Sequence, residues 1–583
     1  MGRFFGRLLA VLVGLTLFTV FFLTITILII ASGAEKPELK DNSILKLELD
    51  KPIYEMAYEN PLDFMPLGSN KAEGYGLVDI RHALVKAAAD SKIKAVLLKI
   101  GIAQTDYAQL QELRTDIENF KKSGKKVYAY SEYFTEGAYY LASVADKVYM
   151  PNVGYIEFNG LNYSVMYFKG TLDKLEIKPE IFKAGVYKSA VEPFLLDKMS
   201  DPNREQTTAF INSLNETLLS AISKSRKIDL PELKMISDSM WVHNPTDAKK
   251  FNLIDELLYK DQVEDVLQKE LKTDKVNYCS LDSYFKIIEN EVTEETSEDK
   301  VAVVVASGDI VSGKGSDDEI GDKTFIENLR KARDDKHVKA IVLRINSPGG
   351  SSLASDLMWR EIMVAKTKKP VIASMSGLAA SGGYYMSMPC DYIYAQENTI
   401  TGSIGVFGMW FNTKDFMKNK LGITTDGVKT GGYSDLGNAN RPLTARERMF
   451  IQAEVDSTYK DFVSKAAQGR KRSFSEIESV ASGRVWTGKQ ALQIGLVDAL
   501  GGLEDAVAYA AKVAKLKNYH TTYIPEKKDF IENIKNKFEE DETNEAEEHL
   551  KSELGELFPY FKYLQKVKKF EGLQARMPDL IIE

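Results

Sequence analysis

The chain has 583 residues, more than one hydrophobic core usually organises, so we expect two or more domains. With 44% hydrophobic residues, 27% charged residues and a net charge of −8, it has the composition of a folded protein without a basic stripe for nucleic acid. Its only cysteines, Cys279 and Cys390, lie far apart and its five histidines stand alone, which excludes a disulfide framework and argues against a metal site. We therefore predict no nucleic-acid partner, no metal and no cofactor. Whether the two cysteines meet stays open.

The N-terminus carries a long apolar segment. Residues 8–31 are 24 residues without a charge, enough to span a bilayer at about 1.5 Å per residue. The apolar region of a cleavable signal peptide has roughly 7 to 15 residues, so we predict an uncleaved transmembrane anchor, with an unusually long signal peptide as the alternative. Arg3 and Arg7 precede the segment, and acidic residues follow it. The positive-inside rule then places residues 1–7 in the cytoplasm and the body of the chain on the other side, attached to membrane lipid through the anchor.

After the anchor, similar segments recur in the same order at a spacing of about 245 residues. KIKAVLLKI at 92–100 resembles HVKAIVLRI at 337–345, and the segment 125–150 resembles 369–395. Two copies of one domain explain this order. The predicted boundaries are 42–285 for the first copy, 286–300 for an acidic linker and 301–520 for the second copy.

Each copy alternates short β-branched runs with amphipathic helical periods. In the second copy, VAVVVAS at 301–307 and AIVLRI at 340–345 are predicted strands, and FIENLRKARDD at 325–335 is a predicted helix between them. Continuous apolar strands separated by helices are typical of a parallel sheet, so the expected fold class is α/β with two tandem repeats. The last segment, 521–583, is strongly charged and has no counterpart in the first copy, so we predict a helical tail there.

Two positions differ between the copies in opposite directions. Ser381 in AASGGYY corresponds to Glu136 in the first copy, which has also lost the glycine turn NSPGG found at 346–350. Lys188 in the first copy corresponds to Ser434 in the second. One copy thus keeps a serine and a glycine turn, and the other keeps a lysine. This complementary loss indicates a single site to which both copies contribute.

These residue types suit acyl transfer. Serine is a weak nucleophile that needs an adjacent base, and lysine can serve once burial lowers its pKa. The backbone N–H groups of the turn, at Gly349 and Gly350, and that of Gly382 are candidate donors to the negative intermediate, and losing one such donor costs about 3 kcal/mol. Singly, each feature has a plainer interpretation: Ser381 as a packing residue, the glycines as a turn, and Lys188 as a solvated side chain. Their joint occurrence favours catalysis.

At these positions the chain resembles the signal peptide peptidase A family in its long, duplicated form. The resemblance rests on four motifs: GVYKSAVEPF at 185–194, INSPGGS at 345–351, ASGGYY at 380–385 and TGSIGV at 401–406. It implies a ClpP/crotonase-like fold in each repeat, a Ser–Lys dyad and a homotetramer on the outer face of a bacterial inner membrane. By the same resemblance, the site residues are Ser381 (nucleophile), Lys188 (general base), Gly382 and Gly350 (oxyanion donors), and Ser403 and Gly349 in supporting roles. The expected substrates are signal peptides left in the membrane.

Three alternatives remain open at this stage. A Ser–Lys dyad does not identify the substrate, so a general envelope quality-control peptidase is the nearest alternative. An enzyme acting on acyl-CoA thioesters could use similar backbone donors, although it would leave Lys188 without a purpose and the anchor topology argues against it. A non-catalytic membrane scaffold would tolerate replacement of Ser381. The sequence also leaves open whether the dyad forms within one chain or between chains.

Overall fold

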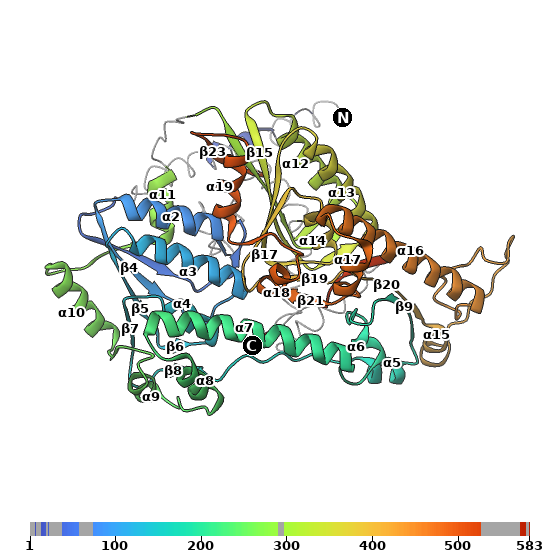
Figure 1. The fold of residues 1–583 in the computed structure, drawn as a ribbon, viewed down its shortest axis with the longest axis horizontal. Helices are drawn as coiled ribbons and strands as arrows, with labels where there is room; N and C mark the ends of the chain where they lie inside the picture. Colours follow the sequence, from blue (N-terminus) through green and yellow to red (C-terminus); the bar gives the residue numbers. More distant parts are fainter. Residues whose placement is uncertain are drawn as a thin grey trace.

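The computed structural model shows two α/β repeats that lie side by side (Figure 1). The residues that it describes are 6, 13–18, 21–22, 38–56, 74–289, 297–316, 318–525, 572–578 and 582. The predicted anchor at 8–31 falls mostly outside these ranges, as do residues 290–296 of the predicted linker. Among the described residues, no helix is both long enough and apolar enough to cross a bilayer.

The first repeat is built on a parallel sheet of six strands in the order β10-β7-β5-β4-β1-β11. The strands are β1 (Ser43–Glu48), β4 (Ile93–Lys99), β5 (Lys126–Tyr130), β7 (Lys147–Met150), β10 (Glu256–Leu257) and β11 (Asn277–Ser280). The helices are α2 (Leu77–Ala89), α3 (Tyr107–Lys121), α4 (Glu136–Ala142), α8 (Leu230–Asp238), α9 (Pro245–Lys250), α10 (Lys260–Leu271) and α11 (Leu281–Glu289). The central strands are buried, as the apolar runs predict for a parallel sheet.

The second repeat repeats this plan on a sheet of eight strands, β21-β19-β17-β15-β12-β23 with β18 and β22 branching from β17. The strands are β12 (Lys300–Ser307), β15 (Val338–Ser347), β17 (Val371–Ala380), β18 (Tyr392–Ala395), β19 (Ile400–Gly402), β21 (Val485–Thr487), β22 (Ala499–Leu500) and β23 (His520–Ile524). The helices are α12 (Asp322–Asp334), α13 (Ser352–Lys366), α14 (Gly382–Ser387), α17 (Phe474–Val480), α18 (Gly488–Gln493) and α19 (Leu503–Val513). The duplication is visible in matched helices: α2 and α12 both have 13 residues, and α3 and α13 both have 15.

A third sheet, in the order β14-β13-β16-β24-β20-β9, combines strands from both repeats. Its strands are β9 (Lys178–Ala184), β13 (Asp309–Val311), β14 (Glu319–Gly321), β16 (Gly349–Ser351), β20 (Val406–Asn412) and β24 (Leu573–Arg576). Strand β9 belongs to the first repeat but pairs antiparallel with β20 of the second, from Lys178↔Asn412 to Ala184↔Val406. This exchange carries the segment that follows β9 into the second repeat.

Two long helices, α7 (Asp201–Arg226) and α16 (Ala445–Arg470), have 26 residues each and follow equivalent positions in the two repeats. Helix α7 runs beneath both repeats in the view of Figure 1, and its Ser213 lies 2.8 Å from Thr487 of β21, hydroxyl to hydroxyl. The remaining elements are β2 (Ile53–Tyr54), β3 (Tyr75–Gly76), β6 (Tyr133–Phe134), β8 (Tyr155–Ile156), α5 (Lys169–Leu175), α6 (Glu192–Leu195) and α15 (Lys414–Leu421).

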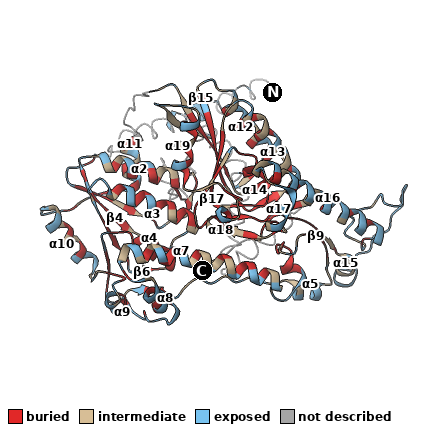
Figure 2. Ribbon diagram, in the orientation of Figure 1, coloured by how far each residue is buried: buried red, intermediate tan, exposed pale blue. Residues whose placement is uncertain are grey.

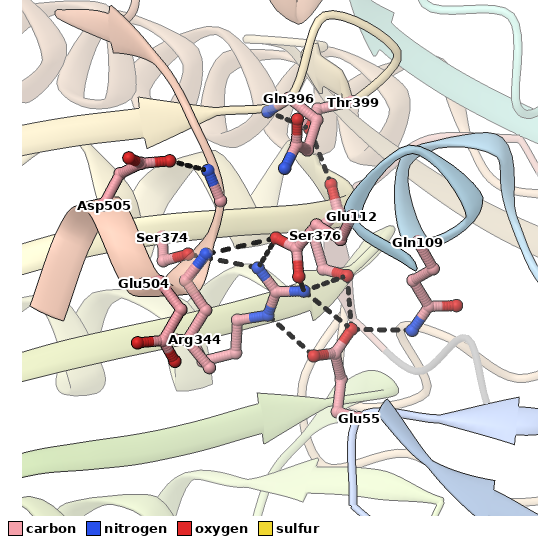
Figure 3. A network of polar contacts seen from close by, with 12 residues as sticks. Glu55, Gln109, Glu112, Arg344, Ser374, Ser376, Gln396, Thr399, Glu504 and Asp505 are labelled. Carbon is pink, nitrogen blue, oxygen red and sulfur yellow. Dashed lines mark hydrogen bonds and ion pairs between the residues drawn. The ribbon is translucent and has the colours of Figure 1, made fainter. Parts of the chain in front are cut away.

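A buried ionic network joins the two repeats (Figure 3). Arg344 of β15 donates to Glu55 at 2.6 Å and to Glu112 of α3 at 2.8 Å, and all three side chains are buried. Burial alone would raise the pKa of Glu112, but the guanidinium groups of Arg344 and Arg81 outweigh it and hold the pKa at about 2. Because removing one partner of a buried ion pair is strongly destabilising, we expect the network to hold the two repeats together. Figure 2 shows that exposure is concentrated in outer helices such as α10 and α15.

The C-terminal segment differs from its prediction where the structure describes it. We expected a helical tail over 521–583, but His520–Ile524 forms β23 at the edge of the second sheet, paired in parallel with β12. Residues Leu573–Arg576 form β24, inside the third sheet. Residues 526–571 lie outside the described residues. The charge pattern of a segment does not report a strand whose partners are hundreds of residues away, which is why the sequence missed both.

Candidate active site

Ser381 occupies a strained turn between a strand and a helix. Strand β17 ends at Ala380, and α14 begins at Gly382, so Ser381 is the residue between them. Its backbone has φ 55° and ψ −110°, a conformation that costs a non-glycine residue on the order of 1–3 kcal/mol. Two backbone hydrogen bonds of 2.8 Å hold it there: Ser381 N–H donates to Gly402 O, and Tyr385 N–H donates to Ser381 O. The turn thus places Ser381 directly after Ala380, the last residue of β17 that pairs with β19.

The glycine turn lies directly against this serine. Gly349 has φ 98°, and a side chain there would meet the backbone nitrogen of Gly382 at 2.7 Å. A Cβ on Gly382 would in turn meet the Cα of Gly349 at 3.1 Å. Both positions therefore require glycine, because the two backbones approach too closely for any side chain. The structure thus brings Gly349 against Gly382, the residue after Ser381, and Gly350 follows Gly349 in β16.

Lys188 reaches the same place from the first repeat. Its Nζ lies 2.8 Å from Ser381 Oγ, 3.1 Å from Ser403 Oγ and 3.2 Å from the Ser403 carbonyl oxygen. Lys188 and Ser381 are both 0% exposed. Burial lowers the pKa of Lys188 well below its usual 10.5. The site therefore favours the neutral amine, which can accept a proton.

The loop that bears Lys188 is clamped by the second repeat and by α7. Tyr187 N–H donates to Ser482 O at 3.0 Å, and a Cβ on Gly483 would meet the backbone of Lys188 at 2.7 Å. The buried amide of Gln206 donates to Tyr187 O at 3.0 Å and to Ser189 Oγ at 3.1 Å. Sequence reasoning missed Gln206 and Gly483, because neither stands in a motif that links it to the lysine.

The equivalent place in the first repeat is filled by Glu136. This carboxyl is buried, and it accepts the N–H of Asn159 at 3.1 Å. Burial raises its pKa to about 7. Ser434, the counterpart of Lys188, lies in the exposed segment 421–434. Within the described chain, the serine and the lysine therefore meet once, in the second repeat.

Other groups considered from the sequence lie apart from this site. Cys279 and Cys390 are both buried and form no disulfide, and burial raises the pKa of Cys279 to about 11. No cluster of three or more His, Cys, Asp or Glu side chains suited to a metal ion occurs in the part of the chain that the structure describes.

A serine on a strained turn, a buried lysine at hydrogen-bond distance and a glycine turn beside them are the groups that a nucleophilic serine site requires, and they meet here on a duplicated α/β protein. The family model of peptidase family S49 matches residues 119–274 and 364–517, one match in each repeat. The chain belongs to peptidase family S49 and is a serine peptidase.

Relatives match most of the chain. Protease 4 of Salmonella typhi is 36% identical over 466 residues, which cover 78% of this chain and 75% of that protein. The chloroplastic serine protease SPPA of Arabidopsis thaliana is 34% identical over 458 residues, covering 77% of this chain and 67% of that protein. Among solved structures, a ClpP1 mutant from Listeria monocytogenes is 16% identical over 35% of this chain and 94% of its own, with a TM-score of 0.24. That score is too low to support a conclusion about the fold.

Proposed function

We propose that this protein is a membrane-anchored serine endopeptidase that degrades cleaved signal peptides, with a Ser381–Lys188 dyad on two ClpP/crotonase-like repeats. The observation that carries the proposal is the 2.8 Å separation of Lys188 Nζ and Ser381 Oγ in a fully buried site. A serine hydroxyl needs a base within this distance, and a lysine whose pKa is lowered by burial can be that base.

Acylation follows from this geometry. Ser381 Oγ forms a bond to the carbonyl carbon of an extended peptide while its proton passes to Lys188 Nζ. The carbonyl oxygen becomes an oxyanion, to which the N–H groups of Gly382 and Gly350 donate. When the intermediate collapses, the C–N bond breaks and Lys188 gives its proton to the leaving amine. The product is an acyl ester on Ser381.

Deacylation uses the same groups in reverse. A water molecule loses a proton to Lys188 and attacks the ester carbonyl, and Ser381 leaves with that proton. Ser403 is 3.1 Å from Lys188 Nζ through its hydroxyl and keeps the amine in place in both halves of the reaction. Gly349 supports the turn by its close approach to Gly382.

The substrate class rests on the predicted anchor and on the family resemblance. Cleaved signal peptides are apolar segments that remain in the membrane, and an anchor at residues 8–31 would hold the site beside them. We place the body of the protein on the extracytoplasmic side of a bacterial inner membrane, with the anchor passing once through the lipid. A general envelope peptidase would use the same dyad, so peptide libraries with and without an apolar core separate the two substrate classes.

We also propose that copies of this chain assemble into a homotetramer. In one chain, β9 of the first repeat pairs with β20 of the second. The second-repeat counterpart of β9 lies within 421–434, a fully exposed segment that includes Val428 and projects at the right of Figure 1. The first-repeat counterpart of β20, residues 161–167, forms no named strand and alternates between half-buried and exposed positions. Pairing these segments between copies would repeat the β9–β20 contact around a closed ring, and exposed apolar residues are typical of such interfaces.

The assembly has a direct test. Val428→Glu places a charge in the exposed segment, and Lys429→Glu changes its neighbour without removing an apolar side chain. Sedimentation of the detergent-solubilised full chain should give tetramers for the parent and Lys429→Glu but smaller species for Val428→Glu. Tetramers that persist in Val428→Glu would contradict the proposed interface.

The catalytic proposal is tested by hydrolysis of a fluorogenic apolar peptide by the full chain in detergent. Lys188→Met keeps an apolar stem of similar length but removes the base, so the rate should fall by about 10²–10⁴-fold. Ser434→Ala, at the exposed counterpart, should leave it unchanged. In the parent, kcat/KM should rise with pH through the lowered pKa of Lys188, because only the neutral amine accepts a proton. Activity retained by Lys188→Met would overturn the dyad and show that another group acts as the base.

A further inference from the structure

Helix α14 carries the candidate oxyanion donor at its first residue. It begins at Gly382 and has only six residues. Helices this short have little stability of their own, so contacts with the rest of the fold must hold α14 in place. Tyr385, four residues after Ser381, is 3% exposed, and its N–H donates to Ser381 O at 2.8 Å. A shift of Tyr385 would therefore move the turn that bears both the serine and the donor.

The hydroxyl of Tyr385 joins α14 to two longer helices. It lies 2.9 Å from Asp356 Oδ1 of α13 and 3.1 Å from Asp461 Oδ2 of α16. A hydroxyl has one proton to donate, so two carboxylates on one hydroxyl need a further donor. Lys465 of α16 supplies it, because its ammonium group donates to Asp461 at 2.7 Å and also to Asp356. We call these four residues the Lys465 cluster.

Charge and burial set the role of Lys465 in this cluster. Its side chain is 17% exposed, and its Nζ lies 4.4 Å from the ring centroid of Trp359 and 5.6 Å from that of Tyr385. Burial alone would lower the pKa of Lys465, but its hydrogen bonds to the two carboxylates raise the pKa above 10.5, so the amine is charged. Without this charge, the two carboxylates would repel each other beside a single hydroxyl.

The first repeat is built differently at the equivalent place. At the spacing of the repeats, Tyr140 of α4 corresponds to Tyr385 and Gln111 of α3 corresponds to Asp356. The side-chain oxygen of Gln111 accepts the N–H of Asn398 at 3.2 Å. A neutral amide that faces another element thus stands where the second repeat has a carboxylate. Asp356 therefore accompanies the serine rather than the plan that the two repeats share.

We propose that Lys465 is a positioning residue for the reaction: its charge holds the cluster on Tyr385, and the cluster holds the N–H of Gly382 at the oxyanion. This inference rests on the proposed function. The oxyanion forms only as the reaction proceeds, so a misplaced donor slows the chemical step without weakening the binding of the peptide. The expected signature of losing Lys465 is a lower kcat with an unchanged KM.

The test is hydrolysis of the fluorogenic apolar peptide by the full chain in detergent. Lys465→Met keeps an apolar stem of similar length but removes the charge, so kcat should fall about 10- to 100-fold with KM unchanged. Lys465→Arg keeps the charge and should recover most of the rate. Lys460→Met, at an exposed lysine of the same helix, is the control and should behave as the parent. A parental kcat in Lys465→Met would overturn the proposal, as would a loss confined to KM.

A second substitution separates the charge of Lys465 from its packing. Asp461→Asn keeps the shape of the side chain but removes one of the two carboxylates, so the cluster no longer needs the positive charge. Lys465→Met combined with Asp461→Asn should therefore recover most of the kcat that Lys465→Met loses. A misfolded variant would not recover in this way. A double variant as slow as Lys465→Met would show that charge does not position the helix, which would also overturn the proposal.

A peptide aldehyde gives a second measurement of the oxyanion donor. Ser381 Oγ adds to the aldehyde carbon, the serine proton passes to Lys188 Nζ, and the former carbonyl oxygen becomes the oxyanion. Lys465→Met should weaken aldehyde binding by about the factor by which it lowers kcat, and unchanged binding would contradict the proposal.

The two proposals fail in different ways. A parent protein that does not hydrolyse the peptide contradicts the proposed function. An active parent whose Lys465→Met variant has the same kcat contradicts only the role of Lys465.

Discussion

The two repeats start from the same plan and end in different chemistry at the same place. In the second, the turn after β17 presents Ser381 beside a glycine turn. In the first, the matching position holds Glu136, whose buried carboxyl accepts a backbone N–H. What the first repeat retains is Lys188, which β9 carries across to the serine. Neither repeat therefore holds all of these groups alone. Strand β9, by pairing with β20, brings Lys188 of the first repeat to Ser381 of the second.

The largest effect is expected when the serine is moved from the second repeat to the first. Ser381→Ala combined with Glu136→Ser returns a serine to the first repeat and removes it from the second. Peptide hydrolysis should stay down by on the order of 10⁶-fold, the loss seen when a serine peptidase loses its nucleophile. Among the described residues, none of the groups that shift the pKa of Glu136 is a lysine. The measurement is hydrolysis of the fluorogenic peptide, with Glu136→Ser alone as the control. Recovered activity would show that the first repeat still contains a working base.

The contact between the repeats can be broken at Arg344. Arg344→Met leaves the buried Glu55 without its arginine and Glu112 with Arg81 alone, which should lower the stability by about 3–5 kcal/mol. Arg330→Met removes a more exposed arginine paired with Glu361 at 2.8 Å and should cost about 1 kcal/mol or less. Denaturant unfolding of the full chain measures both. Equal losses in the two variants would mean that the buried network does not hold the repeats together.

The buried carboxyl of the first repeat predicts a difference in pH dependence. The pKa of Glu136 is raised from 4.5 to about 7, so its contribution to stability is fully present below pH 4.5 and is lost as the pH rises toward 7. The penalty above pH 7 is on the order of 3 kcal/mol. Glu136→Gln removes this titration, so the variant should lose less stability than its parent between pH 4.5 and pH 8. Parallel stability curves for the two proteins would contradict the assigned environment.

The smallest effect is expected at Gln206, whose side chain holds the loop that bears Lys188. Gln206→Ala removes the amide that donates to Tyr187 O and Ser189 Oγ, so kcat should fall about tenfold with little change in KM. The unsatisfied partners should also lower the free energy of unfolding by about 1–3 kcal/mol. Gln452→Ala removes an amide that donates to Lys183 O at 3.3 Å, on β9 before the loop, and serves as the matched control. If both variants behave alike, Gln206 does not position Lys188.

Local patterns predicted much of this molecule. The α/β class followed from apolar runs separated by amphipathic helices, and the duplication followed from segments recurring in order. The family assignment rested on short motifs, such as those around Lys188 and Ser381, and the family model matches both repeats. That these two residues act as base and nucleophile stays a prediction, although they lie 2.8 Å apart.

The features that sequence reasoning missed are long-range pairings. Gln206 stands in no motif near the lysine loop it holds, and Arg344 lies in a strand far from Glu55. Strand β24 lies within a charged segment that was predicted to be helical. In each case the partners come from distant parts of the chain, so no local periodicity records them.

By itself, the sequence determined the secondary structure of the repeats, their duplication and the residue types available for catalysis, because these depend on side-chain period and chemistry within short windows. Tertiary structure decided that β9 crosses to the second repeat, that Lys188 is buried against Ser381, and that β24 pairs with the glycine turn. The reason is physical: a lysine pKa is lowered by the atoms packed around it, and a strand finds its partners only when the chain has folded.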